Sequence, residues 1–383
     1  SIRLIDTTEA FAALGGQWNE LLERSARPNI FLTHEWLFTW WEVYGRGKQL
    51  SILLCCEDNG ELLGILPFYI EKRGLLPKVN VLRFLGSEGV TSEFLECIAA
   101  KGKERRVYDA VFGHLQREKT RWDIVECANV ETGTQFDQYL REQCASGIQV
   151  EANGTHGKCP YAELPGSREA FMKSLSFKTR KRTRYFRNAL AKRGEVSVYT
   201  SCDARRLGSD LDDAIGLYRA NMSRRGWKEK FSSGEYMAFY RKICERFLAL
   251  GRLQLSFLQV NGGRAAFLNS FKYQNRIYAY HTGFDETWRD YSVGFVLLGH
   301  LLEKAVGEGF THFEFLRGGQ RYKYHWAITG ERELADVMLS GGSPSGRLYR
   351  LKCSALSASK GMLRKVAPAG AIEFARKVFA HRI

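Results

Sequence analysis

The clearest pattern of apolar and polar positions in the chain lies between residues 276 and 326. Residues 277–282 are largely β-branched or aromatic, which is typical of a strand. Residues 294–306 place apolar side chains at helical spacing, and residues 311–316 form a second apolar run that ends before two glycines. The pattern predicts a strand, a helix and a second strand. A connection of this length predicts that the two strands are parallel and that the helix packs across them.

Two hairpins precede helices in this chain. Residues 49–73 and 253–285 are each apolar runs interrupted by an Asn-Gly turn, Asn59-Gly60 in the first and Asn261-Gly262 in the second, 202 positions apart. A loop, a helix with a Gly-His-Leu triplet and a strand follow each hairpin. We interpret this repeated order as two copies of one α/β unit.

The repeat and the glycine-rich break after residue 339 suggest a division of the chain. We predict an N-terminal domain over residues 1–164, a C-terminal domain over residues 165–342 and a basic tail over residues 343–383. Each domain is expected to be a mixed sheet flanked by helices, so the fold class is α/β (α+β). Further helices are expected at residues 11–25, 31–45, 109–119, 136–144, 210–226 and 233–250, and strands at 79–85 and 122–127.

Three tryptophans, Trp36, Trp40 and Trp41, lie on the predicted helix at residues 31–45, where Thr33 is a suitable N-cap. Core packing is the favoured interpretation of this cluster over a ligand-binding role.

The chain has 383 residues and a net charge of +15, and this charge is concentrated in two segments. Residues 178–193 carry eight Lys or Arg and no acid, and residues 343–383 carry nine against a single Glu, which gives +8 for each segment. The remainder is therefore about neutral. A solvated basic helix is the commonest form of such a run, but residues 178–193 also suit a phosphate-rich acceptor, a tRNA or a membrane face. The tail is expected to dock on an anionic membrane surface.

Several classes of protein are excluded by composition. No apolar run approaches the roughly 18–20 residues of a membrane-spanning helix, and the N-terminus lacks the pattern of a signal peptide. Nine scattered cysteines without CxxC spacing predict reduced thiols and no zinc. We expect a cytoplasmic protein, peripheral to the inner membrane if its tail docks there. No DNA-binding motif is present.

Several segments together resemble a known family: residues 31–41, 61–70, 182–196 and 283–326, and Trp227. Their order is similar to that of tandem GNAT acyltransferases, and more narrowly to the CelD/BcsL-type acetyltransferases, which are related to the FemABX aminoacyltransferases. The resemblance implies transfer of an acyl group, in particular acetyl, from acetyl-CoA or another acyl-CoA to an amine or hydroxyl of a saccharide or glycolipid precursor. It implies envelope or exopolysaccharide synthesis and no metal.

The sequence departs from the family pattern in three places. Ser292-Val293-Gly294 stands where the family commonly has Ser-Pro-Gly, and Glu314-Phe315 stands where it has Asp-Phe. Glu93-Phe94 is nearest to its early Asp-Tyr. The surrounding loop, residues 86–93, is a candidate for part of an acceptor pocket.

The resemblance implies a donor site at the second helix. The pantetheine arm would lie beside the strand that contains Tyr280, and the pyrophosphate at the start of the following helix. The residues of that corner are Arg289, Ser292, Val293 and Gly294. An ordinary helix start with a surface arginine is the competing interpretation.

Five residues are candidates for the chemistry. Tyr322 and Lys323 resemble an aromatic-lysine pair near the reaction centre of FemABX transferases, although a solvated turn lysine is the commoner case. Glu314, expected to be partly buried on its strand, is a candidate general base, with Asp285 and His281 as close rivals. Alternation along the strand also permits Glu314 to face outward.

Two other functions remain open from the sequence. One is FemABX-like transfer of an aminoacyl group from tRNA, which the basic helix favours. The other is a non-catalytic tandem-GNAT scaffold of a polysaccharide synthase system, which the departures at Val293 and Glu314 favour.

Overall fold

The computed structural model describes the chain except for residues 75, 77, 144–148, 225–229, 341 and 354–383. Trp227 and most of the predicted tail therefore lie outside the described residues. Within the described part, thirteen strands form one sheet in the order β1-β2-β3-β4-β6-β13-β7-β12-β11-β10-β9-β8, with β5 beside β3.

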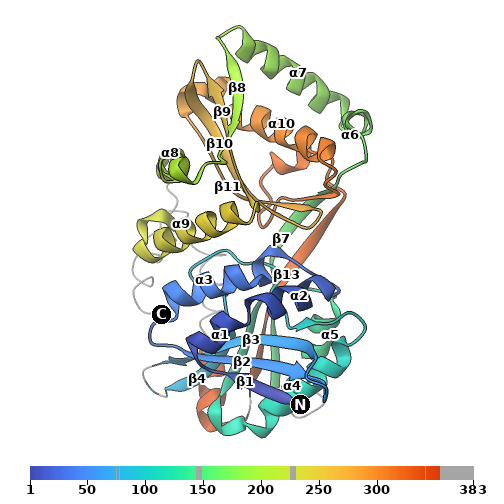
Figure 1. Cartoon of the computed structure of the whole chain (residues 1–383), viewed down its shortest axis with the longest axis vertical. Coiled ribbons are helices and arrows are strands. Elements are labelled where there is room, and N and C mark those ends of the chain that lie inside the picture. The colour runs from blue at the N-terminus through green and yellow to red at the C-terminus, as the bar shows by residue number, and fades with distance from the viewer. Residues whose placement is uncertain (75, 77, 144–148, 225–229, 341, 354–383) are drawn as a thin grey trace.

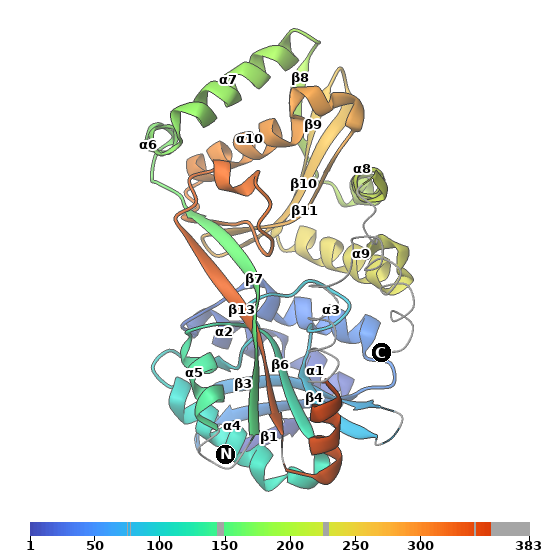
Figure 2. The same ribbon diagram turned by 180° about the vertical axis from the view of Figure 1, so that it is seen from behind.

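The N-terminal half is a mixed sheet between two groups of helices (Figures 1 and 2). Helices α1–α3 cover one face, and α4 and α5 cover the other. The parallel pairing of β4 with β6 closes a strand–helix–strand unit around α4. The strands are β1 (Ile2–Ile5), β2 (Gln49–Cys56), β3 (Leu62–Arg73), β4 (Val79–Phe84), β5 (Ile98–Ala99) and β6 (Ile124–Glu131). The helices are α1 (Thr8–Ala13), α2 (Gly15–Arg24), η1 (Ile30–Leu32), α3 (His34–Tyr44), α4 (Glu104–Arg117), η2 (Lys119–Arg121) and α5 (Gln135–Glu142).

The C-terminal half repeats this order. The hairpin of β9 and β10 leads to β11, α10 and then β12, which pairs with β11 in parallel as predicted. Helices α6, α7 and α10 lie on one side of these strands, and α8 and α9 on the other (Figure 1). The strands are β8 (Val196–Thr200), β9 (Leu253–Val260), β10 (Gly263–Tyr273), β11 (Arg276–Phe284) and β12 (His312–Glu314). The helices are α6 (Arg168–Ser174), α7 (Phe177–Ala191), α8 (Ala204–Arg224), η4 (Lys230–Ser232), α9 (Gly234–Ala249), η5 (Glu286–Tyr291), α10 (Val293–Gly307) and η6 (Lys323–His325).

Two long strands join the halves (Figure 2). They are β7 (Gln149–Glu163) and β13 (Gly330–Ser340), which pair with each other in antiparallel fashion. Strand β7 also pairs with β12 of the C-terminal half, and β13 pairs with β6 of the N-terminal half. Strand β7 from the first part of the sequence thus extends the sheet of the C-terminal half, and β13 from the second part extends the sheet of the N-terminal half. The predicted division at residue 164, just after β7, stays a prediction.

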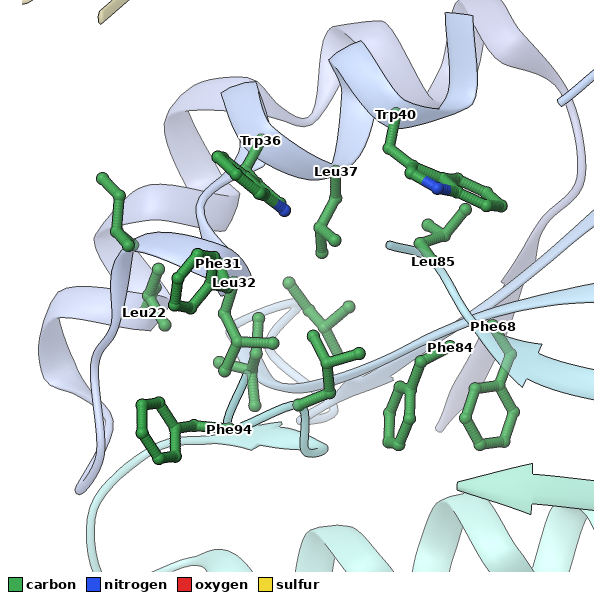
Figure 3. Packing of buried hydrophobic residues seen from close by; sticks show 14 of the residues in the cluster. Leu22, Phe31, Leu32, Trp36, Leu37, Trp40, Phe68, Phe84, Leu85 and Phe94 are labelled. Atoms are coloured by element: carbon green, nitrogen blue, oxygen red, sulfur yellow. The ribbon is translucent and has the colours of Figure 1, made fainter. Parts of the chain in front are cut away.

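Two of the three tryptophans of α3, Trp36 and Trp40, pack into the core as predicted (Figure 3). Trp36 and Trp40 are fully buried, while Trp41 is half-buried. The Trp36 ring meets Phe239 of α9 edge-on at 5.0 Å, so it ties the two halves together. The indole nitrogens of Trp36 and Trp40 donate to Ser92 Oγ at 2.9 Å and to the Glu88 carbonyl at 2.7 Å. The aromatic core therefore holds the loop of residues 86–93 in place.

Most predicted elements are confirmed, with shifted ends. The predicted fold class is confirmed, because both halves are mixed sheets flanked by helices with one repeated order. The turn residues Asn261 and Gly262 have φ of 51° and 77°, as an Asn-Gly hairpin turn requires. The predicted strand at residues 311–316 is shorter, ending at Glu314, because Leu316 has φ of 56° and turns the chain. Within the described residues, no helix is both long enough and apolar enough to cross a membrane.

Candidate active site

A cavity of about 1030 Å³ lies between the two halves of the chain. Its walls come from β4, β6 and the loop of residues 86–93 on one side, and from α8, β11, α10 and residues 315–323 on the other. Eight of the ten predicted site residues line it: Tyr280, His281, Arg289, Ser292, Val293, Gly294, Tyr322 and Lys323. The sequence prediction thus converges on one place. The roles predicted for these residues remain predictions.

Strand β11 is distorted where it borders the cavity. Asn269 of β10 is paired with His281 and the next residue, Ser270, with Ala279, so Tyr280 is an extra residue in β11. Such a bulge changes the direction of neighbouring side chains. It lets consecutive residues of β11, from Ala279 to Phe284, all border the cavity.

The other edge of β11 is open beside the cavity. Strand β12 pairs with β11 only from Arg276 to Tyr278, and no described strand pairs with residues 279–284 on that side. Backbone N–H and C=O groups on an open strand edge can pair with an extended ligand. The cavity therefore offers a binding edge for a chain that carries amide groups.

The N-terminus of α10 faces the same cavity. Ser292 precedes the helix with φ of 49° and ψ of 43°, and its side chain makes no capping bond. A Cβ atom added at Gly294 would meet no atom within 4 Å, so space is open in front of the first turn. Arg289 is exposed on the preceding helix η5. The first N–H groups of a helix attract anions, and an arginine adds to that attraction.

Glu93 is a buried carboxylate in the wall of the cavity. It was not among the site residues predicted from the sequence. Its Oε1 accepts from the backbone nitrogen of Arg317 at 2.9 Å, and its Oε2 accepts from Cys159 Sγ at 3.3 Å. Burial raises the pKa of Glu93, although the positive charge of Arg317 opposes the change. A carboxylate with a raised pKa in a cavity is suited to accept a proton.

Lys323 lies in the same wall and is buried. Its Nζ donates to the carbonyl oxygens of Leu316 at 2.9 Å and Arg317 at 3.0 Å. The turn at Leu316 presents both carbonyls to this amine. Burial lowers the pKa of Lys323 to about 8, although Glu93 opposes the change. An ammonium group has three N–H donors, so one remains for a ligand.

His281 is buried. Its Nε2 lies 2.5 Å from the hydroxyl of Tyr236, and burial, followed by the positive charge of Lys230, lowers its pKa well below the ordinary range. A proton taken up by this imidazole would be held weakly. The structure therefore gives Glu93 more support as a base than His281, because burial raises the pKa of Glu93 and lowers the pKa of His281.

Glu314 and Asp285 do not line the cavity. Glu314 is fully buried and forms ion pairs with Arg276 and Arg332, each at 2.8 Å. Asp285 caps helix η5 by accepting from the Thr287 nitrogen at 3.0 Å. Both carboxylates therefore have structural partners, and the catalytic role predicted for them finds no geometric support here.

The N-terminal wall carries a network of opposite charges. Arg83 donates from Nε to Glu126 at 2.9 Å and also pairs with Glu88, which in turn binds Arg73. Burial acts against the charge of Arg83, but Glu126 and Glu88 outweigh it and raise its pKa. Since these charges compensate one another, this wall is polar without a strong net charge.

Glu93, Arg317 and Lys230 are cavity residues that sequence reasoning did not select. A signal was present for Glu93, because it ends the loop at residues 86–93 that was a candidate for part of an acceptor pocket, and because Glu93-Phe94 is nearest to the early Asp-Tyr of the resembling family. Arg317 carries no comparable local signal. Its contacts with Glu93 and with Asn129 Oδ1, at 2.6 Å, arise only when the two halves meet.

Comparison with known proteins agrees with this fold. Residues 178–324, which include α7 from its second residue and the C-terminal wall of the cavity, match the family model described as acetyltransferase (GNAT) domain. A crystal structure of FemX is similar with a TM-score of 0.60 and 10% identity, covering 87% of this chain and 96% of that chain. No curated protein sequence matches the chain.

Two further solved structures are similar over most of their length. A conserved protein of unknown function from Bacteroides thetaiotaomicron has a TM-score of 0.54 and 13% identity, covering 89% of this chain and 99% of that chain. The C-terminal domain of a putative lysylphosphatidylglycerol synthetase from Agrobacterium fabrum has a TM-score of 0.51 and 9% identity, covering 90% and 97%. At these identities the likeness shows the fold alone. The chain has a GNAT fold, and the narrower CelD/BcsL resemblance stays a prediction.

Proposed function

We propose that the protein is an acyltransferase that moves an acyl group from a CoA thioester to an amine or hydroxyl of a saccharide or glycolipid precursor. One observation carries the proposal. A single cavity combines an open strand edge and a free helix N-terminus with two buried titratable groups, Glu93 and Lys323.

The donor would lie along β11 and end at α10. The pantetheine arm contains amide groups, which can pair with the open edge at residues 279–284. The pyrophosphate would be held by the first N–H groups of α10 and by Arg289. The open space at Gly294 lets the phosphates approach the backbone closely.

The acceptor nitrogen or oxygen would form a bond with the acyl carbon, and the carbon–sulfur bond would then break. Glu93 is the group we assign to take the acceptor's proton, because burial raises its pKa. Lys323 is assigned to give a proton to the leaving thiolate, since its pKa of about 8 is close to that of a thiol. Proton transfer from Glu93 to Lys323 through solvent would restore the starting state.

The acceptor would occupy the N-terminal wall. Arg83, Glu88, Glu126 and Asn129 present hydrogen-bonding groups whose charges compensate one another. Such a wall suits an acceptor rich in hydroxyl groups more than a strongly charged one. The proposed place in envelope or exopolysaccharide synthesis rests on the family resemblance.

Isothermal titration of the full chain with acetyl-CoA and a series of longer acyl-CoAs tests the donor. We expect binding of at least one member and competition by free CoA. Failure of every member to bind would overturn the proposal and would leave the aminoacyl-tRNA donor and the non-catalytic scaffold as the remaining interpretations.

A second candidate donor is an aminoacyl-tRNA. The observation that favours it is a second arginine near the donor corner: the Arg193 guanidinium lies 5.2 Å from the centroid of the Tyr291 ring at the end of η5. Binding of charged tRNA that weakens steeply with salt, together with no binding of any acyl-CoA, would select this donor.

A further inference from the structure

Helix α7 has an inner side that is anchored by arginines. Arg187 pairs with the buried Glu303 of α10, and the Arg182 guanidinium lies 4.8 Å from the centroid of the Phe295 ring. Arg180 donates to carbonyl oxygens just before the helix, including that of Leu175. Three of the basic residues in this helix therefore hold it against the body of the protein.

The outer side of α7 has a different composition. Phe177 and Tyr185 are 74% and 65% exposed, and Lys178, Lys181 and Arg184 are exposed beside them. At 100° per residue these five positions share one side of the helix, and we call them the outer α7 face. Among the described residues, no carboxylate forms an ion pair with its three cations. Ion pairing within the described part of the chain therefore does not account for these three cations.

The outer α7 face is accessible to a flat partner. Figures 1 and 2 show α7 as the outermost helix at the end of the molecule opposite the N-terminus, with α10 beneath it. None of its five residues lines the cavity between the halves, nor the smaller hollow of about 490 Å³ near Ser176 and His325. A nucleic acid strand is usually tracked by a groove, whereas a bilayer needs only a protruding surface.

We infer that the outer α7 face docks the protein on the surface of an anionic lipid bilayer. Lys178, Lys181 and Arg184 provide attraction to lipid phosphates. Phe177 and Tyr185 are large exposed rings that fit the headgroup region, where aromatic side chains gather. The inner arginines keep the helix folded on the protein, so docking requires no rearrangement. This surface is separate from the proposed donor and acceptor sites and from the predicted docking of the tail.

Co-sedimentation of the full chain with vesicles tests the inference. The vesicles contain phosphatidylcholine, either alone or mixed with phosphatidylglycerol. We expect binding to the mixed vesicles to fall about 100-fold in Lys178→Gln/Lys181→Gln/Arg184→Gln, roughly five-fold for each neutralised cation. The matched control Arg3→Gln/Lys101→Gln/Lys103→Gln makes the same change in net charge with exposed residues of the N-terminal half. Equal binding by the two triple variants would overturn the inference.

Two further measurements test the contribution of the aromatic rings to vesicle binding and test RNA as the alternative partner of the outer α7 face. Phe177→Ser/Tyr185→Ser is expected to lose the binding that persists at high salt, where charge attraction is screened. Unfractionated tRNA serves as the competing probe. Loss of tRNA binding in the outer-face triple variant with unchanged vesicle binding would assign the face to RNA and overturn the inference. Unchanged melting temperatures and acyl-CoA binding would show that each variant is folded.

Discussion

The carboxylate of Glu93 accepts a hydrogen bond from the backbone nitrogen of Arg317 at 2.9 Å. The bond joins a loop of the N-terminal half to the turn after β12, although the two residues are 224 positions apart. The same turn presents the carbonyls of Leu316 and Arg317 to Lys323. The two groups that we assign to proton transfer are thus positioned by one short segment of backbone.

Glu93→Gln tests the proton acceptor. The amide oxygen can still accept from the Arg317 nitrogen, so the fold should be retained, while proton uptake is lost. We expect kcat to fall at least about 100-fold, the usual contribution of a positioned base. The control is Cys159→Ala, which removes a donor to Glu93 but keeps its charge, and which should change kcat less than about five-fold. An active Glu93→Gln enzyme would exclude Glu93 as the base.

The pH dependence of the reaction should report Lys323. Its ammonium form is present below the pKa of about 8 and is lost as the pH rises through that value. We therefore expect kcat/KM to decrease above pH of about 8, and Lys323→Gln to lower kcat about 100-fold and abolish this decrease. If the decrease persists in the variant, another group causes it.

Gly294 provides a test of the donor corner. Because a Cβ at this position meets no atom within 4 Å, Gly294→Leu should fold normally and project its side chain toward the space assigned to the donor phosphates. We expect the Kd for acyl-CoA to rise at least about 10-fold with little change in melting temperature. Gly216→Leu is the matched control, since Gly216 is also helical and equally open. Equal affinities of the two variants would contradict the assigned donor site.

Glu314 is expected to contribute to stability and not to catalysis. Glu314→Ala leaves Arg276 and Arg332 without their common partner, and removal of one member of a buried ion pair costs about 3 kcal/mol at the lower end of the usual range. The lower end applies because both guanidinium groups are partly exposed to water. Denaturant unfolding measures the loss. If kcat falls strongly while stability is kept, the role of Glu314 as base, predicted from the sequence, is supported instead.

Local patterns were sufficient for much of the fold. The Asn-Gly turns, the helix at residues 293–307 and the parallel pairing of the strands beside it follow from spacing and turn chemistry. Strand β7 was not predicted, because its Asn, Gly and Pro residues have low strand propensity. Its formation depends on pairing with β13 and β12, which are distant in sequence.

The site could be predicted only in part for the same reason. The residues near α10 belong to one continuous segment, so one motif locates them together. For Glu93 the sequence offered only its position in a candidate loop, and its role as a base is suggested once the packing of the two halves brings Arg317 and Lys323 beside it. Conversely, the sequence predicted Glu314 as a partly buried candidate base, but it could not show the arginine partners of Glu314, which come from β11 and β13.

The exchange of β7 and β13 between the halves also affects how the protein is made. Strand β6 ends at Glu131 and receives its neighbour β13 only after Ser340 has been synthesised, roughly 200 residues later. At typical elongation rates, this corresponds to about 10–40 s during which the edge of β6 is unpaired. An unpaired edge can associate with other chains. We therefore expect that premature termination before β13 yields an aggregating product and that synthesis of β13, more than local folding, limits completion of the N-terminal sheet.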